Sequence, residues 1–132
     1  MSLINLINFS NLGDTRGSLI AIEGSDDIPF PIKRVYYIYD TKGVSRGFHA
    51  HIKLKQVAIC LSGKCRILLD NGYKKEEVNL DSPHEGLLID RMIWREMHDF
   101  SDDCVLLVLA SENHDESDYI RDYKKFKSVV RK

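Results

Sequence analysis

The sequence lacks an excess of basic residues. Lysine and arginine together number 19 against 20 acidic residues, so the formal net charge is −1. This balance argues against a general binder of nucleic acid or of anionic membranes, because such proteins gain much of their affinity from cations that meet phosphates. It still leaves room for one small phosphorylated ligand, which needs only a few well-placed arginines.

Long apolar runs and paired cysteines are also missing. No apolar run approaches the ~20 residues that span a bilayer, and the first residues, MSLINLINF, lack the basic region of a signal peptide. The three cysteines, Cys60, Cys65 and Cys104, form no CxxC pair, so we expect free thiols in a reducing compartment. The sequence therefore predicts a cytoplasmic protein, and 132 residues suit a single domain over residues 1–132.

Helical periodicity is scarce before the tail. Most of the chain has the period-two pattern of strands, which predicts strands at residues 17–23, 33–40, 86–90, 94–100 and 104–111. Between residues 56 and 80 we expect two hairpins, with turns at Ser62-Gly63 and Asn71-Gly72.

Only residues 115–130 have a helical pattern, because Tyr119, Ile120, Tyr123 and Phe126 recur at spacings of three and four. Many short strands followed by one helix are typical of a small all-β barrel or sandwich.

The segment RGFHAH, residues 46–51, places two histidines two positions apart. Residues i and i+2 on a strand share a face, so His49 and His51 point the same way, and Tyr37 shares a face with Val35 on the strand before. The pattern leaves three interpretations open: histidines on the surface or hydrogen-bonded in the core, proton-transfer groups, or metal ligands. Imidazole titrates nearest to neutral pH of all side chains, which suits proton transfer.

Several segments resemble known proteins. Residues 47–63, which contain HAH and end at Gly63, resemble the first motif of the cupin superfamily. The segments DTRGSL, IKRVYYIYDTKG, RGFHAH, CLSGKCRILLDNG, WREMHDFS and SDYIRDYKKFK, in this order, resemble the dTDP-4-keto-6-deoxyglucose 3,4-ketoisomerases over residues 14–126. The resemblance implies an all-β cupin jelly-roll barrel with a short C-terminal helix.

The resemblance also implies a reaction: the carbonyl of a dTDP-linked hexose moves from C4 to C3 through an enediolate, in deoxy-aminosugar biosynthesis. Such a step needs a base, an acid and a group that stabilises the oxyanion. By resemblance, His49 is the expected base and His51 the partner in proton transfer, although the spacing does not decide between this assignment and the reverse. Tyr37 is a candidate donor to a sugar oxygen. No redox cofactor is expected, because the ketone is its own electron sink.

Arginines and an aromatic residue complete the implied site. Arg46 and Arg16 are the expected phosphate clamps, while Trp94 and Arg95 are expected to line the pocket mouth, although Trp94 also suits a core position. Metal cupins have a glutamate soon after HxH and a later histidine. Here residues 52–56 read IKLKQ and Arg95 stands near the place of that histidine, so we expect no metal.

Alternatives remain: a dTDP-sugar 3,5-epimerase-like enzyme, a non-catalytic sugar-binding cupin, and a metal-dependent cupin. Related cupins are commonly dimers, and we expect a homodimer that covers an exposed apolar N-terminal stretch at Leu3, Ile4, Leu6, Ile7 and Phe9. The expected partners are therefore a dTDP-hexose and a second copy of the chain, with no nucleic acid and no membrane.

Overall fold

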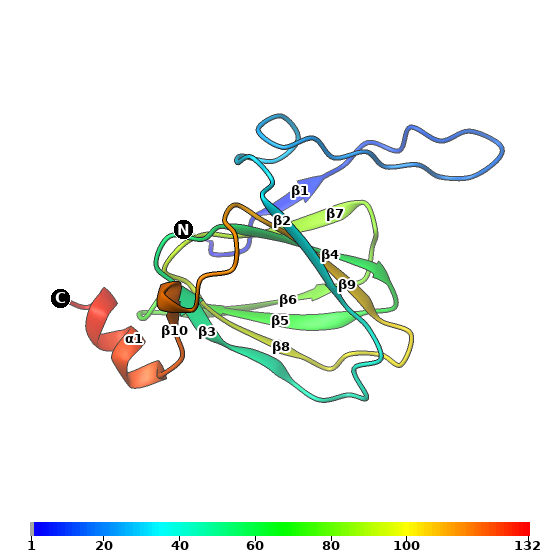
Figure 1. Ribbon diagram of the computed structural model, residues 1–132. Helices are drawn as coiled ribbons and strands as arrows, with labels where there is room; N and C mark the ends of the chain where they lie inside the picture. The colour runs from blue at the N-terminus through cyan, green and yellow to red at the C-terminus, as the bar shows by residue number, and fades with distance from the viewer. Residues whose placement is uncertain (1) are drawn as a thin grey trace.

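The computed structural model describes residues 2–132, which fold into a sandwich of two antiparallel β-sheets (Figure 1). The strand order is β1-β7-β4-β9-β2 in the first sheet and β10-β3-β8-β5-β6 in the second. The elements are β1 (Leu6–Asn8), β2 (Arg34–Ile38), β3 (Arg46–His51), β4 (Gln56–Ser62), β5 (Cys65–Asp70), β6 (Lys75–Leu80), β7 (Glu85–Ile89), β8 (Trp94–His98), β9 (Val105–Ala110), the 3₁₀ turn η1 (Glu116–Asp118), β10 (Tyr119–Ile120) and α1 (Tyr123–Val130). The predicted all-β jelly-roll with a short C-terminal helix is confirmed.

One of the two predicted hairpins is present. β5 and β6 pair across the Asn71-Gly72 turn, where Gly72 has the positive φ of 94° that a glycine adopts without strain. The hairpin predicted at Ser62-Gly63 is wrong, because β4 and β5 belong to different sheets. The same turn signal here carries the chain from one sheet to the other.

The strand predicted at residues 17–23 is also wrong. In this part of the chain only isolated bridges form, one of them between Asp14 and Gly17. The segment belongs to a long arm that extends beyond the sandwich (Figure 1), with Leu12 63% and Leu19 54% exposed. The extended backbone here pairs within the arm itself, where the Leu12 N–H donates to the Leu19 carbonyl oxygen, and not with a strand of either sheet.

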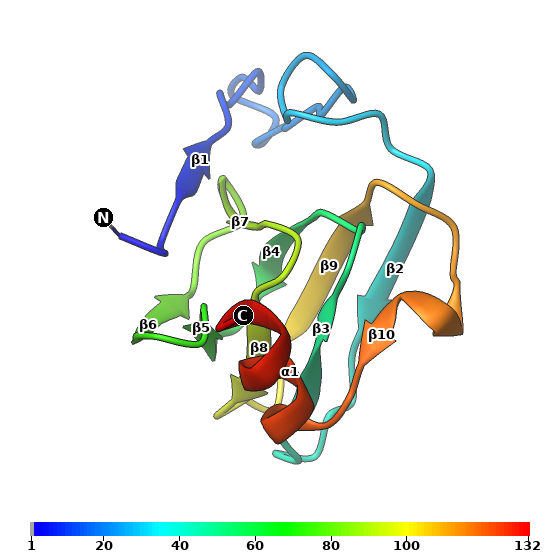
Figure 2. The ribbon, with the colours of Figure 1, turned by 90° about the vertical axis from the view of Figure 1, so that its left-hand side faces the viewer.

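The predicted C-terminal helix is shorter than expected. Asp115 caps the 3₁₀ turn and Asp122 caps α1 by accepting hydrogen bonds from the amides of Lys124 and Lys125. Between the two caps, Tyr119 and Ile120 form β10 and pair with His51 and Ala50 of β3. Figure 2 shows α1 beside β8 and β3, where Phe126 is fully buried against Trp94.

The two most apolar strands, β4 and β9, face the apolar core between the sheets. β4 and β9 lie at interior positions of the first sheet, and their side chains pack against Ile67 and Leu69 of β5 in the second. The outer face of the first sheet is partly covered by the chain before β2, where Phe9, Ile28 and Phe30 pack together. β4 is therefore covered on both faces, as its apolar run requires.

The N-terminal stretch that we expected to be exposed packs largely within its own chain. β1 pairs with β7, Leu3 and Ile4 contact the central core, and Phe9 is buried, which leaves Leu6 partly exposed. A second chain is therefore not needed to cover this stretch.

No helix among the described residues has the length and apolar character needed to cross a bilayer.

Candidate active site

A cavity of about 570 Å³ opens where the edge strand β2 of one sheet faces β3 and β10 of the other. This volume lies within the ordinary range of small-molecule sites. Among the described residues, three arginines line it, Arg34, Arg46 and Arg121, and no carboxylate does. A concave surface of this charge favours an anionic ligand.

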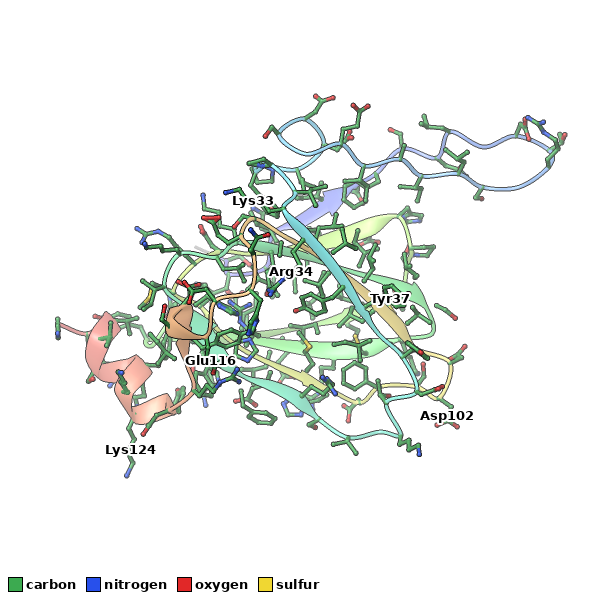
Figure 3. All side chains as sticks on the ribbon, viewed as in Figure 1. Lys33, Arg34, Tyr37, Asp102, Glu116 and Lys124 are labelled. Carbon is green, nitrogen blue, oxygen red and sulfur yellow. The ribbon has the colours of Figure 1, made fainter. Side chains whose placement is uncertain are left out.

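Strand alternation decides which side chains of β2 reach the cavity. Arg34 and Tyr36 face inward and line it, whereas Tyr37 points outward and is 61% exposed (Arg34 and Tyr37 are labelled in Figure 3). The structure therefore does not bring Tyr37 to the cavity of its own chain. Its neighbour Tyr36 supplies the phenol there, because the inner face of β2 is the face of the even-numbered residues.

A β-bulge in β3 positions the first histidine. The pairing of β3 with β8 shifts register between Gly47 and His49, and Gly47 and Phe48 both have positive φ, 93° and 59°. A side chain at Gly47 would meet the Arg95 carbonyl oxygen at 3.0 Å, so the close approach of the two strands requires glycine there. Bulges commonly re-aim a side chain beside an active site.

His49 lines the cavity as a neutral imidazole. Burial and then the charge of Arg95 lower its pKa from 6.5 to about 4. Its Nδ1 lies 3.0 Å from the Gly47 carbonyl oxygen, which can only accept, so Nδ1 carries the proton and Nε2 has the free lone pair. The bulge thus fixes the tautomer of a group that can accept a proton.

His51 lies directly behind His49, with the two rings edge to face and their centroids 4.8 Å apart. Burial and then Arg95 lower the pKa of His51 to about 2, and neither ring nitrogen has a hydrogen-bond partner within residues 2–132. Its Nδ1 is 3.3 Å from Asp118 Oδ2, without the alignment of a hydrogen bond. Tyr119, opposite His51 in the β3–β10 pair, packs against both imidazoles.

Arg95 lies behind the cavity and not at its mouth. It is fully buried, and Nη1 donates to Gln56 Oε1 at 2.5 Å while Nε and Nη2 reach the Ile93 carbonyl oxygen. Because Arg95 can only donate, Gln56 must present its oxygen to it, and the Gln56 amide nitrogen then donates to the Tyr36 hydroxyl at 3.1 Å. The Tyr36 proton remains available to a ligand, and burial raises the pKa of this phenol.

Of the other predicted site residues, one lines the cavity and two do not. Arg46 lines the cavity at the start of β3. Trp94 is buried on the outer face of the second sheet, against α1, as a core residue, so it does not line a pocket mouth. Arg16 lies in the extended arm and pairs with Asp14, and it does not line this cavity.

Sequence reasoning missed two arginines and two tyrosines that line the cavity: Arg34, Tyr36, Tyr119 and Arg121. The last two fell in a segment that was predicted as helix, and Arg121 lies over the Tyr119 ring and pairs with Glu116. Strand alternation could have identified the first two, because Arg34 and Tyr36 share the face of the strand opposite to that of Tyr37. The sequence alone did not tell which of the two faces points inward. Among residues 2–132, the two groups of three potential metal ligands contain neither His49 nor His51.

The fold and the cavity define a cupin-type protein whose site is built for an anionic small molecule. A family model described as "FdtA: WxcM-like, C-terminal" matches residues 2–131, and the chain belongs to this family. The TDP-4-oxo-6-deoxy-alpha-D-glucose-3,4-oxoisomerase of Aneurinibacillus thermoaerophilus is 58% identical over 128 residues, 96% of this chain and 92% of that protein.

Solved structures agree with this assignment. A 3,4-ketoisomerase from Helicobacter canadensis is 48% identical with a TM-score of 0.94, and 98% of each chain is covered. A mutant of the 3,4-ketoisomerase QdtA from Thermoanaerobacterium thermosaccharolyticum, in complex with TDP-4-keto-6-deoxyglucose, is 46% identical with a TM-score of 0.94, covering 99% of this chain and 96% of that one.

Proposed function

We propose that this protein is a sugar-nucleotide isomerase that moves the carbonyl of dTDP-4-keto-6-deoxyglucose from C4 to C3. The observation that carries the proposal is the neutral imidazole of His49 at the wall of a cavity lined by arginines, with the His51 ring packed directly behind it. The relatives named above act on or bind this class of substrate. The activity belongs to a pathway of deoxysugar biosynthesis in the cytoplasm.

The reaction is two coupled proton transfers. His49 Nε2 removes the C3 proton, the electron pair of the C–H bond forms the enediolate, and the imidazolium of His49 then gives a proton to C4. A second proton passes from the C3 hydroxyl to the C4 oxygen, which leaves a ketone at C3. His51 supports this second transfer, so both imidazoles begin and end the cycle neutral.

The negative charge of the enediolate needs stabilisation. Tyr36 donates its free hydroxyl proton toward the sugar oxygens, and Arg95 acts on it through Gln56. A buried cation without a carboxylate partner is costly unless an anion forms nearby during the reaction. Arg95 is such a cation, because it donates its hydrogen bonds to two neutral acceptors, the Ile93 carbonyl oxygen and the Gln56 side-chain oxygen.

The arginines at the cavity bind the diphosphate. Arg46 and Arg34 are the main candidates, since Arg34 Nε is buried without a hydrogen-bond partner and Arg46 is exposed at the cavity. Arg121 is held by Glu116 and offers less free charge. Arg16 would reach a site only if the arm were placed by a second chain.

The active form is a homodimer. Val35 and Tyr37 on the outer face of β2, and Tyr39 just after the strand, are between 53% and 61% exposed, next to the apolar cluster of the outer sheet face. The arm carries the exposed side chains of Leu12 and Leu19 outside both sheets. Exposed edges and apolar patches of this kind are normally covered. Light scattering should give twice the chain mass of 15.2 kDa, and a monomer mass would refute the dimer.

The decisive experiment follows dTDP-4-keto-6-deoxyglucose by NMR in heavy water with purified protein. We expect the 3-keto isomer to appear, with no exchange of the C5 proton. Exchange at C5 would identify a 3,5-epimerase instead. Binding of the nucleotide sugar without any exchange or product would identify a non-catalytic binding protein.

A further inference from the structure

All three cysteines of the chain meet at one place, away from the histidines. Cys60 lies on β4, Cys65 begins β5 and Cys104 directly precedes β9, and their sulfur atoms lie within 4.8 Å of one another. The Cys60 and Cys104 sulfurs are 3.7 Å apart, and all three residues are free thiols. We call these residues the thiol cluster.

The thiol cluster lies at the end of the sandwich opposite α1. It is next to the turn at Ser62-Gly63 and to the loop that contains Asp102, which is labelled in Figure 3. The two strands that enter this turn belong to different sheets. The cluster therefore joins β4 and β9 of the first sheet to β5 of the second.

The geometry of the thiol cluster suits a metal ion. Three sulfurs within 4.8 Å of one another have a common centre no more than about 2.8 Å from each, which brackets the metal–thiolate distance of roughly 2.3 Å known for zinc. Isolated buried cysteines behave as small apolar residues, but nothing in that role requires three sulfurs to face each other.

The surroundings select the kind of ion. The three residues are at most 2% exposed, so water has little access as a further ligand. Among the described residues no histidine or carboxylate completes this group. Thiolates without oxygen ligands disfavour Mg²⁺ and Ca²⁺ and favour soft ions.

Asp81 and Asp103 are the charged groups whose fields reach the cluster, and both are acidic, so they favour a cation.

From these contacts we propose that Cys60, Cys65 and Cys104 form a three-coordinate site for a soft, thiophilic metal cation, of the class of Cu⁺ and Cd²⁺. A bound ion links the two sheets at the end of the sandwich where no helix covers them. This site is separate from the imidazole pair and does not depend on the isomerase function.

Titration of the reduced, metal-free full chain with Cd²⁺ under anaerobic conditions tests the proposal. We expect an ultraviolet thiolate-to-cadmium charge-transfer band that saturates at one ion per chain, with an increase in melting temperature. Absence of a saturating band in the unmodified protein would overturn the proposal, whatever the behaviour of the variants.

Variants locate the ion. Cys60→Ser and Cys104→Ser should each weaken Cd²⁺ binding at least tenfold, and Cys60→Ala is the second choice if the serine variant does not fold. The His49→Asn/His51→Asn double variant should keep the full band, because its histidines lie outside the cluster. A band that survives both serine variants, or disappears in the histidine variant, refutes the site.

Discussion

The interior of this sandwich is built in two different ways. Between β4, β5 and β9 it is apolar, with Ile67 and Leu106 without solvent exposure. Beside β2, β3 and β10 the same interior holds Arg95, Gln56 and His51, all buried and with no carboxylate hydrogen-bonded to Arg95. Buried polar groups normally lower the stability of a fold. The apolar side of the sandwich therefore stabilises the protein, whereas the polar side lowers its stability and provides the groups for the reaction.

The largest effect should come from the polar side. His49→Asn removes the base and should lower kcat by about 10²- to 10⁴-fold, the usual contribution of a positioned acid or base. The amount of folded protein should not change, because His49 is at the cavity wall. Turnover is measured by NMR of the sugar nucleotide.

The matched control is His84→Asn. His84 is exposed and contacts Ser82 in a loop, so this change should leave turnover as it is. Parental turnover in the His49 variant would exclude His49 as the base.

The apolar side should respond in stability instead. Ile67→Ala opens a cavity in a fully buried position and should lower the free energy of unfolding by about 2–5 kcal/mol. Activity per folded molecule should stay the same. The same change at Ile52, which is 41% exposed, is the control and should cost far less. Denaturant unfolding followed by circular dichroism measures both. Equal losses would contradict the division of the interior.

Two adjacent tyrosines give the sharpest test of which face of β2 is catalytic. Tyr36→Phe removes the donor toward the enediolate and should lower kcat about 10- to 100-fold, as expected for a hydrogen bond to a charged group. Tyr37→Phe should leave kcat unchanged, because Tyr37 faces away from the cavity. Steady-state kinetics of the two variants decide between them, and the opposite ranking would refute the role of Tyr36.

A smaller effect is expected at the cavity mouth. Arg46→Ala should raise KM about tenfold with little change in kcat, since the arginine binds a phosphate that does not react. The exposed Lys124→Ala is a suitable comparison, because Lys124 lies on α1 away from the cavity. A loss confined to kcat would mean that Arg46 acts on the reacting atoms.

The sequence was sufficient where local pattern and tertiary structure agree. The spacing of His49 and His51 predicts a shared face, and both rings lie together on the inner side of β3. The pattern failed where tertiary contacts chose between equal local options. Tyr119 and Ile120 fit a helix by spacing, but caps at Asp115 and Asp122 and pairing with β3 make them a strand.

Two further features depend on contacts that the sequence does not reveal. The bulge at Gly47 arises from close approach to Arg95 of β8, 48 residues later in the chain. The face of β2 that turns inward depends on the sheet that packs against it, so parity alone left Tyr36 and Tyr37 equivalent. Spacing within a strand can thus be read from sequence, whereas the inner face cannot.

The smallest expected effect concerns pH. Because burial beside Arg95 lowers the pKa of His49 to about 4, the base form persists well below neutrality. Between pH 7 and pH 5 the value of kcat/KM should therefore stay nearly constant, and it should fall as the pH drops through about 4, where His49 becomes protonated. A histidine with the ordinary pKa of about 6.5 would lose roughly thirtyfold by pH 5. Circular dichroism at each pH separates this titration from unfolding. A fall of kcat/KM near pH 6.5 would mean that the His49 imidazole is solvated during catalysis. Burial in the polar side of the interior would then not set the basicity of His49.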